Sequence, residues 1–289
     1  MIFISTSCVK QKHINESIIK LVQNGFKNIE LSGGTEYYLN IVDDLIDLKK
    51  KYNINYILHN YFPPQKENFV LNLASLDEII FEKTISALIN SIKLSKLLSI
   101  GKFGLHAGFL IDISTDDIGK RITFSKLLDK DKALERFCMG WELIKKEADN
   151  VELYIENNVL SLLNYKNFNE QNPFLLTNTD EYLELKKQIN FNLLLDIGHL
   201  KVSCNTLNLN FYKELNSLFS ESNYIHLSDN NKTEDENKLI LENSNMWNLL
   251  KKYNFAGKTV TLEINNNIEN IKKNYELIEN KVSYDKNAL

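Results

Sequence analysis

Cysteine is scarce in this chain of 289 residues, which contains only Cys8, Cys138 and Cys204. The number is odd, the three positions are widely separated, and no Cys-x-x-Cys pair occurs. This pattern argues against a disulfide framework and fits a reducing compartment. We therefore expect a cytoplasmic protein.

Long apolar runs and an excess of basic residues are also missing. No window reaches the roughly 18 to 20 apolar residues of a membrane span. The first residues, MIFISTSCVKQKH, lack the order of segments that marks a signal peptide. The chain has 34 Lys and Arg residues and 38 Asp and Glu residues, so its net charge is -4. The sequence thus argues against a membrane or nucleic acid as partner, and it leaves a homo-oligomer open.

Hydrophobic residues, by contrast, make up 43% of the chain, which is enough for a large core. Short apolar or β-branched runs alternate with longer amphipathic stretches along the whole sequence. Eight such runs occur, at residues 2–6, 27–31, 54–60, 103–108, 151–157, 191–197, 223–229 and 258–264. A strand-helix unit repeated eight times over roughly 250 residues predicts an α/β fold, a single (β/α)8 TIM barrel. We expect one domain that spans residues 1–289.

The stretches between these runs have helical periodicity. They cover residues 16–26, 38–52, 76–98, 133–148, 179–189, 211–219, 246–253 and 270–280. An open, doubly wound sheet is the competing architecture, but a Gly-rich phosphate turn would usually follow its first strand, and SCVKQKH stands there instead. The longest irregular insertions, 109–130 and 157–176, both follow strands. In a barrel they would overhang the mouth where active sites are built.

Acidic and histidine side chains stand at the ends of most predicted strands. Four of the five histidines lie at such positions. In strand order, the residues are Glu30, His59, His106, Glu156, Asp196 with His199, His226 with Asp229, and Glu263. Because the carboxyl ends of barrel strands meet at one mouth, we expect these side chains to converge.

A ring of carboxylates and neutral imidazoles is the ligand set of a divalent metal, either Mn, Mg, Co, Fe or Zn. Without a cation, so many carboxylates would repel one another and resist ionisation. A single strand-end residue more often serves packing, and we expect Glu30 to be neutralised by a nearby helix or loop. Chance is a poor explanation for four consecutive strand ends, so we predict a shared metal on Glu156, Asp196, His226 and Glu263.

The remaining histidines have two open interpretations. His199 either holds Asp196 in place or binds a second ion. His59 and His106 either bind a further ion or donate hydrogen bonds to a substrate hydroxyl group.

The segments LYIENN, LLLDIGH, YIHLSD and TLEI contain the four predicted ligands in order along the chain. This arrangement resembles the xylose isomerase-like TIM-barrel superfamily, which is also called AP endonuclease family 2. The resemblance covers nearly the whole chain. The superfamily includes sugar epimerases of the tagatose/psicose 3-epimerase kind and zinc nucleases of the endonuclease IV kind.

In the epimerases, the positions that match Glu156, Asp196, His226 and Glu263 hold one divalent ion, and the two glutamates also move the proton. Such epimerases often add a basic residue after the strand-seven histidine, where this chain offers Lys232. The resemblance implies a sugar or sugar-phosphate isomerase or epimerase that acts through a metal-stabilised enediolate. One glutamate would remove the proton, the other would return it, and His199 would bind a substrate oxygen or orient the site.

In the nucleases, further histidines that match His59 and His106 bind metal, and FVLNLAS after His59 is similar to the nuclease segment. An Asp-x-His after strand seven completes their three-metal cluster. Here the nearest match is Asp235-Glu236-Asn237, so the histidine is missing. Duplex recognition also needs basic phosphate contacts. We therefore favour a small-molecule sugar substrate over phosphoester cleavage, and keep a non-catalytic metal- or sugar-binding barrel as the third class.

Overall fold

Eight parallel strands close into a barrel in the computed structural model, which describes residues 1–117 and 121–287. Each strand pairs with the next one along the chain, and β8 pairs with β1. The strands are β1 Ile2–Ser5, β2 Asn28–Leu31, β3 Asn55–His59, β4 Lys102–His106, β5 Glu152–Glu156, β6 Asn192–Asp196, β7 Tyr224–Leu227 and β8 Thr259–Leu262. The predicted (β/α)8 barrel is confirmed.

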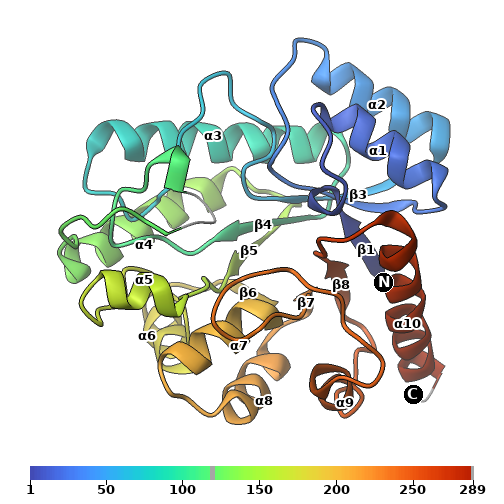
Figure 1. The fold of residues 1–289 in the computed structure, drawn as a ribbon. Coiled ribbons are helices and arrows are strands. Elements are labelled where there is room, and N and C mark those ends of the chain that lie inside the picture. Colours follow the sequence, from blue (N-terminus) through green and yellow to red (C-terminus); the bar gives the residue numbers. More distant parts are fainter. Residues whose placement is uncertain (118–120, 288–289) are drawn as a thin grey trace.

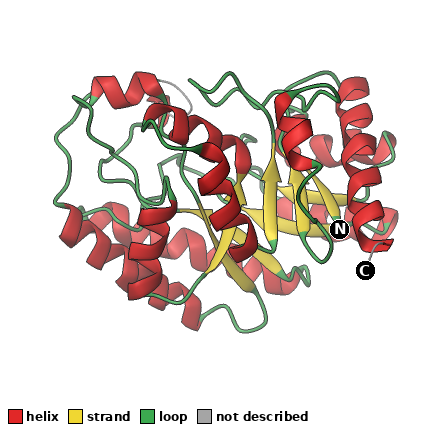
Figure 2. Cartoon of the chain, turned by 90° about the horizontal axis from the view of Figure 1, so that it is seen from below, coloured by secondary structure: helices red, strands yellow, loops and turns green. Residues whose placement is uncertain are grey.

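Helices surround the strands, which lie at the centre of the molecule in Figure 2. Helix α10 lies beside β1, close to the N-terminus (Figure 1), and Tyr275 Oη donates to the carbonyl oxygen of Ile2 over 3.3 Å. The α-helices of the described residues are α1 Ile14–Gln23, α2 Ile41–Tyr52, α3 Glu78–Leu97, α4 Lys130–Lys146, α5 Leu162–Asn167, α6 Thr179–Gln188, α7 Ile197–Thr206, α8 Phe211–Glu221, α9 Asn245–Leu250 and α10 Ile268–Asn287.

Two of these helices, α5 and α7, were not expected from the sequence. Helix α5 lies inside the predicted irregular insertion 157–176. Helix α7 begins directly after β6, and eight of its ten residues are buried. A helix buried on nearly every side has no polar face, so it leaves no amphipathic period in the sequence. Asp196 caps this helix by accepting a hydrogen bond of 2.7 Å from the backbone N–H of His199.

The two predicted insertions pack against each other beyond the ends of β4 and β5. Phe109 and Phe174 form an isolated antiparallel bridge, and their rings meet edge to face. Both belong to a small apolar cluster that also contains Val70, Ile122 and Leu160. Positions 118–120 of the first insertion lie outside the described residues. The described parts form a second, smaller core on the mouth side of the barrel.

The inward-facing side chains of the barrel change character along the strands. One interior cluster is apolar and aromatic, and consists of Phe3, Ile57, Tyr154, Leu194 and Tyr224. Successive side chains of a strand alternate between faces, so the residue two positions further on also points inward. Those next positions are Ser5, His59, Glu156, Asp196 and His226. The alternation therefore places a polar layer directly above the apolar one, at the carboxyl ends of the strands.

Gly104 makes room for this polar layer. A Cβ atom at this position would lie 2.7 Å from Leu194 Cδ2 and 3.1 Å from His59 Cδ2. We expect Gly104→Ala to lower the free energy of unfolding by about 1–3 kcal/mol, because the added carbon overpacks the interior. Denaturant unfolding measures this loss. An unchanged midpoint would contradict the close packing of Leu194 and His59 over this glycine.

Candidate metal centre at the carboxyl ends of the strands

The four predicted ligands lie together in the barrel mouth. One side-chain ligand atom from each of Glu156, Asp196, His226 and Glu263 lies within 4.8 Å of the others. His226 Nδ1 is 3.2 Å from Glu156 Oε1, 3.5 Å from Glu263 Oε2 and 4.0 Å from Asp196 Oδ2. The structure thus brings into one group four side chains that are up to 107 positions apart in the sequence, since 263 − 156 = 107.

Strand register places these side chains at the same level. Asp196 is directly opposite His226 in the pairing of β6 with β7. Glu156, the last residue of β5, is opposite His106 at the end of β4. Glu263 follows the last residue of β8, and its backbone N–H donates to the carbonyl oxygen of Leu227 over 3.1 Å. The ring is therefore a product of the parallel pairing, and its members depend on closure of the barrel.

Three buried atoms of this group have no hydrogen-bond partner. They are Glu156 Oε1, Asp196 Oδ2 and His226 Nδ1. A buried polar atom without a partner costs about 1–3 kcal/mol, so three such atoms facing one another need an explanation. Two carboxylate oxygens and an imidazole nitrogen are suitable ligands for a divalent cation. The residues present therefore fit the divalent metal that the sequence predicts.

The histidine of this group is held between opposing carboxylates. Burial disfavours the charged imidazole of His226, but the Glu30 and Glu263 carboxylates outweigh burial and hold the pKa of His226 well above its ordinary value. Burial alone would raise the pKa of Glu263, yet the His226 ring lowers it to about 2. In the metal-free protein, protons on imidazole thus supply part of the positive charge that the carboxylates require.

The carboxyl of Asp196 behaves differently from that of Glu263. Burial, together with the nearby Glu156 charge, raises the pKa of Asp196 to about 7, although His199 and His226 act in the opposite direction. Metal ligands must be deprotonated, so an ion that binds here competes with protons on Asp196 and His226.

Metal affinity should consequently rise with pH across neutrality. Both the Asp196 and the His226 pKa values are raised, so each group holds its proton to a higher pH than the free amino acid and releases it on binding. We expect the affinity for Co²⁺ to increase about tenfold per pH unit for each proton released, between about pH 6 and about pH 8. Calorimetry in buffers of different ionisation enthalpy counts these protons. Binding without proton release would contradict the electrostatics described.

Two further histidines contact the other oxygen of Glu156. His59 Nε2 lies 2.8 Å from Glu156 Oε2, and His106 Nδ1 lies 3.0 Å from the same atom. Of the two rings, His59 is buried, whereas 21% of the His106 side chain is exposed. Glu156 therefore faces His226 with one oxygen and this histidine pair with the other. A second compact set of ligand atoms is formed by His59, Glu156 and His226.

His199 extends the group on the opposite side, from the first turn of α7. Its Nδ1 donates to the carbonyl oxygen of Asn157 over 2.9 Å, which fixes the ring and directs Nε2 toward two carboxylates. Nε2 lies 3.4 Å from Asp235 Oδ2 and 3.9 Å from Asp196 Oδ2. The structure thus brings Asp235, which the sequence suggested as an additional ligand, to the rim of the group.

Asp229 lies outside this arrangement. Its Oδ1 accepts hydrogen bonds from Lys201 Nζ and from the backbone N–H of Asn230. The partner Lys201 was not considered from the sequence, because it lies 28 positions away on α7. An Asp with these partners has no need of a metal ion.

Glu30 is the strand-end residue for which the sequence favoured a structural role. It is fully buried, and a Glu30 oxygen lies within 4.8 Å of ligand atoms of His59 and Glu263. The expected neutralising helix or loop is not what it contacts. Its Oε2 instead accepts hydrogen bonds across the barrel interior, one of them from His226.

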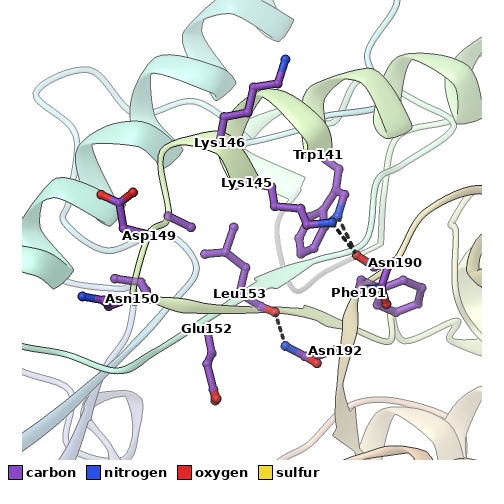
Figure 3. A pocket seen from close by; sticks show the side chains of 12 residues that line it. Trp141, Lys145, Lys146, Asp149, Asn150, Glu152, Leu153, Asn190, Phe191 and Asn192 are labelled. Atoms are coloured by element: carbon purple, nitrogen blue, oxygen red, sulfur yellow. Dashed lines mark hydrogen bonds between the residues drawn. The ribbon is translucent and has the colours of Figure 1, made fainter.

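A separate hollow of about 470 Å³ lies at the amino ends of β5 and β6 (Figure 3). Trp141 Nε1 and Lys145 Nζ both donate to the carbonyl oxygen of Asn190 there, each over 3.3 Å. In (β/α)8 barrels, this end serves stability rather than catalysis. The chemistry therefore belongs to the opposite end, where the carboxylates and imidazoles gather.

A closed (β/α)8 barrel with a buried His, Glu and Asp cluster at its mouth defines a class of metal-site barrels. The chain belongs to the xylose isomerase-like TIM barrel family, whose model matches residues 18–281. The resemblance noted from the sequence is thereby confirmed. A search of curated proteins finds no significant match.

Solved structures with the same fold include both kinds of enzyme named above. A D-tagatose 3-epimerase-like protein is 18% identical with a TM-score of 0.72, over 99% of this chain and 98% of its own. A D-psicose 3-epimerase from Clostridium cellulolyticum, solved with D-tagatose, is 15% identical with a TM-score of 0.66, over 99% of both chains. Endonuclease IV from Thermus thermophilus is 14% identical with a TM-score of 0.61, over 98% of this chain and 99% of its own. Among the described residues, no helix is long and apolar enough to cross a membrane.

Proposed function

We propose that this protein is a divalent-metal-dependent isomerase or epimerase that moves a proton beside the carbonyl group of a sugar. One observation carries the proposal: two glutamates, Glu156 from β5 and Glu263 after β8, face a single centre that Asp196 and His226 complete. Paired carboxylates on separate strands are suited to take a proton and to return it.

In this proposal, Glu156, Asp196, His226 and Glu263 hold the ion. The ion would polarise a substrate carbonyl and the neighbouring hydroxyl oxygen, and would stabilise the negative charge that develops there. Since histidines lower the pKa of Glu156 and Glu263 against the effect of burial, both carboxyls are ionised at neutral pH. Either one can therefore accept the substrate proton, and its partner returns a proton after taking one from solvent water.

His199 would orient the substrate rather than transfer the proton. Its Nδ1–H is occupied by the carbonyl oxygen of Asn157, so the ring orientation is fixed and Nε2 points toward the carboxylates. A ring held this way can position a substrate oxygen at the rim of the centre. Tyr61 lies beside this group, with its ring centroid 6.1 Å from that of His106, and would line the substrate site.

The comparisons support a sugar as the substrate class. The structural neighbours described above include two that carry names of sugar 3-epimerases, and one of them was solved with a ketose. The net charge of -4 adds no reason to expect a nucleic acid. We therefore propose ketoses and related sugars as the first compounds to test.

The experiment is proton exchange in heavy water. Metal-loaded protein is incubated with a panel of free and phosphorylated ketoses, and NMR follows deuterium at the carbon beside the carbonyl. An abasic-site DNA strand with the same metals serves as the parallel assay. Deuterium in one sugar supports the proposal. Cleavage of the strand without any sugar exchange would overturn it.

The histidine pair on Glu156 favours a second candidate, hydrolysis of a phosphoester by a cluster of ions. His59 and His106 both approach Glu156 Oε2, which would allow this carboxylate to bridge two metals. His199 and Asp235 offer ligands for a third. Asn237 stands where the nucleases have a histidine, and an amide is a poor replacement for an imidazole zinc ligand.

Metal counting separates the two candidates. A mononuclear sugar enzyme should keep its one ion in His59→Ala and His106→Ala, since neither residue belongs to the four-ligand set. A phosphoesterase cluster should lose a second or third equivalent in these variants. Elemental analysis of purified wild type and of both variants measures the ratio. Wild type with more than one tightly bound equivalent would move the assignment to phosphoester hydrolysis.

A further inference from the structure

Glu30 is a buried carboxylate for which the proposed reaction has no use. It lies on β2, whereas its partners lie on β7 and β8, three and two strands away around the closed barrel. Its Oε2 accepts a hydrogen bond of 2.8 Å from Thr261 Oγ1 and another from the Tyr224 hydroxyl. The third contact of the same oxygen is His226 Nε2, at 3.0 Å. All three partners are fully buried.

The two nitrogens of His226 therefore face two different environments. Nδ1 faces Glu156, Glu263 and Asp196, the ligand set of the metal centre. Nε2 faces Glu30. A neutral imidazole that gives Nδ1 to a metal keeps its proton on Nε2, so the buried N–H needs an acceptor at that point. Glu30 Oε2 lies at the distance of a good hydrogen bond.

We propose that Glu30 is a positioning residue that prepares His226 to bind metal. Its carboxylate accepts the Nε2 proton, fixes the ring orientation and makes Nδ1 a stronger ligand. Carboxylates behind metal-bound histidines have this effect, and their loss typically weakens metal binding about 10- to 100-fold. The inference rests on the metal centre of the proposed function, and it does not depend on which substrate that centre acts on.

Tyr224 and Thr261 hold Glu30 in turn. Tyr224 precedes His226 by two residues on β7, so both side chains point into the barrel. Thr261 is the register partner of His226 on β8. The two hydroxyl groups therefore hold the carboxylate from β7, the strand of His226 itself, and from the neighbouring β8. If Glu30 served packing alone, loss of one of these hydroxyl groups would weaken metal binding as much as loss of the carboxylate.

Three variants separate positioning from packing. Glu30→Met keeps most of the side-chain volume and removes the acceptor. Glu30→Gln keeps an amide oxygen that can accept from His226 Nε2, but it carries no charge. Tyr224→Phe removes one hydrogen bond to Glu30 and leaves the Glu30–His226 contact in place. Thermal unfolding of each metal-free variant identifies any that fails to fold.

The measurement is Co²⁺ affinity, followed by visible absorption on the full chain. We expect Glu30→Met to bind about 10- to 100-fold more weakly than wild type, Glu30→Gln to lie between the two, and Tyr224→Phe to stay nearest to wild type. In the zinc-loaded protein with ¹⁵N-labelled histidine, NMR should show a slowly exchanging Nε2 proton on His226. This proton should exchange faster in Glu30→Met, where it has lost its acceptor.

The outcomes are distinct. Wild-type affinity and wild-type proton exchange in Glu30→Met would overturn the role of Glu30, and so would an equal loss in Tyr224→Phe. If Glu30→Met does not fold, Glu30→Gln decides, because unchanged affinity and unchanged proton exchange there would contradict the inference. A wild-type protein that binds no Co²⁺ contradicts the metal centre itself. Absence of sugar exchange together with the expected order of affinities contradicts only the proposed reaction.

Discussion

Glu156→Gln is expected to lower the rate of proton exchange on the sugar substrate by about 10²- to 10⁴-fold, the usual contribution of a general base. The substitution preserves the shape of the side chain but leaves a neutral amide, which cannot accept the proton. Glu156 is fully buried among histidines that keep its pKa low against the effect of burial, so the wild-type group is ionised and ready at neutral pH. Deuterium incorporation followed by NMR measures the rate.

His199→Ala is the control for this prediction. It removes a ring at the rim of the centre, 3.8 Å from Glu156 Oε1, and leaves both glutamates in place. We expect a smaller loss of rate than in Glu156→Gln, because an orienting group is lost while the acid and base remain. A Glu156→Gln protein that exchanges faster than His199→Ala would contradict the assignment of the base.

Asp196→Ala and His226→Ala should each weaken metal binding by about 100-fold or more. Protein sites with four ligands bind zinc with about 10–16 kcal/mol, so one ligand of four corresponds to several kcal/mol. Elemental analysis after dialysis measures the ion that stays bound.

Asp229→Ala is the matched control, since it makes the same chemical change 33 positions further along the chain (229 − 196 = 33). Asp229 accepts from Lys201 and lies outside the ligand set, so this variant should keep its ion. Loss of metal in Asp229→Ala to the extent seen in Asp196→Ala would mean that the centre is not where the four side chains converge.

The strands of this protein could be predicted from the sequence because each is a short apolar run between polar segments. Residues 191–197, for example, contain apolar positions on both sides of Asn192 before Asp196, and β6 occupies Asn192–Asp196. Helix α7 could not be predicted in the same way, because the apolar sequence continues through it and burial on nearly all sides removes the helical period. Helix α5 is only six residues long, which is too short for a clear pattern.

For the candidate site, the sequence indicated which side chains would meet but not which of them would contact one another. Strand ends meet at one mouth in a barrel, and this rule alone was enough to group Glu156 with His226. The pairing of Glu30 with His226 spans 196 positions and crosses the barrel interior, and no local pattern encodes it. The same holds for Asp229, whose role depends on Lys201 of α7.

The ring of ligand side chains at the carboxyl ends also has a kinetic consequence. Its members come from β5 through β8, and the support behind His226 comes from β2, so no fragment with only the first four strands contains the set. Contacts this distant in sequence form late, after the cost of closing long loops has been met. A nascent or partly folded chain therefore presents scattered carboxylates and imidazoles instead of a chelate. The four side chains therefore form one set only after β5 through β8 have paired with one another.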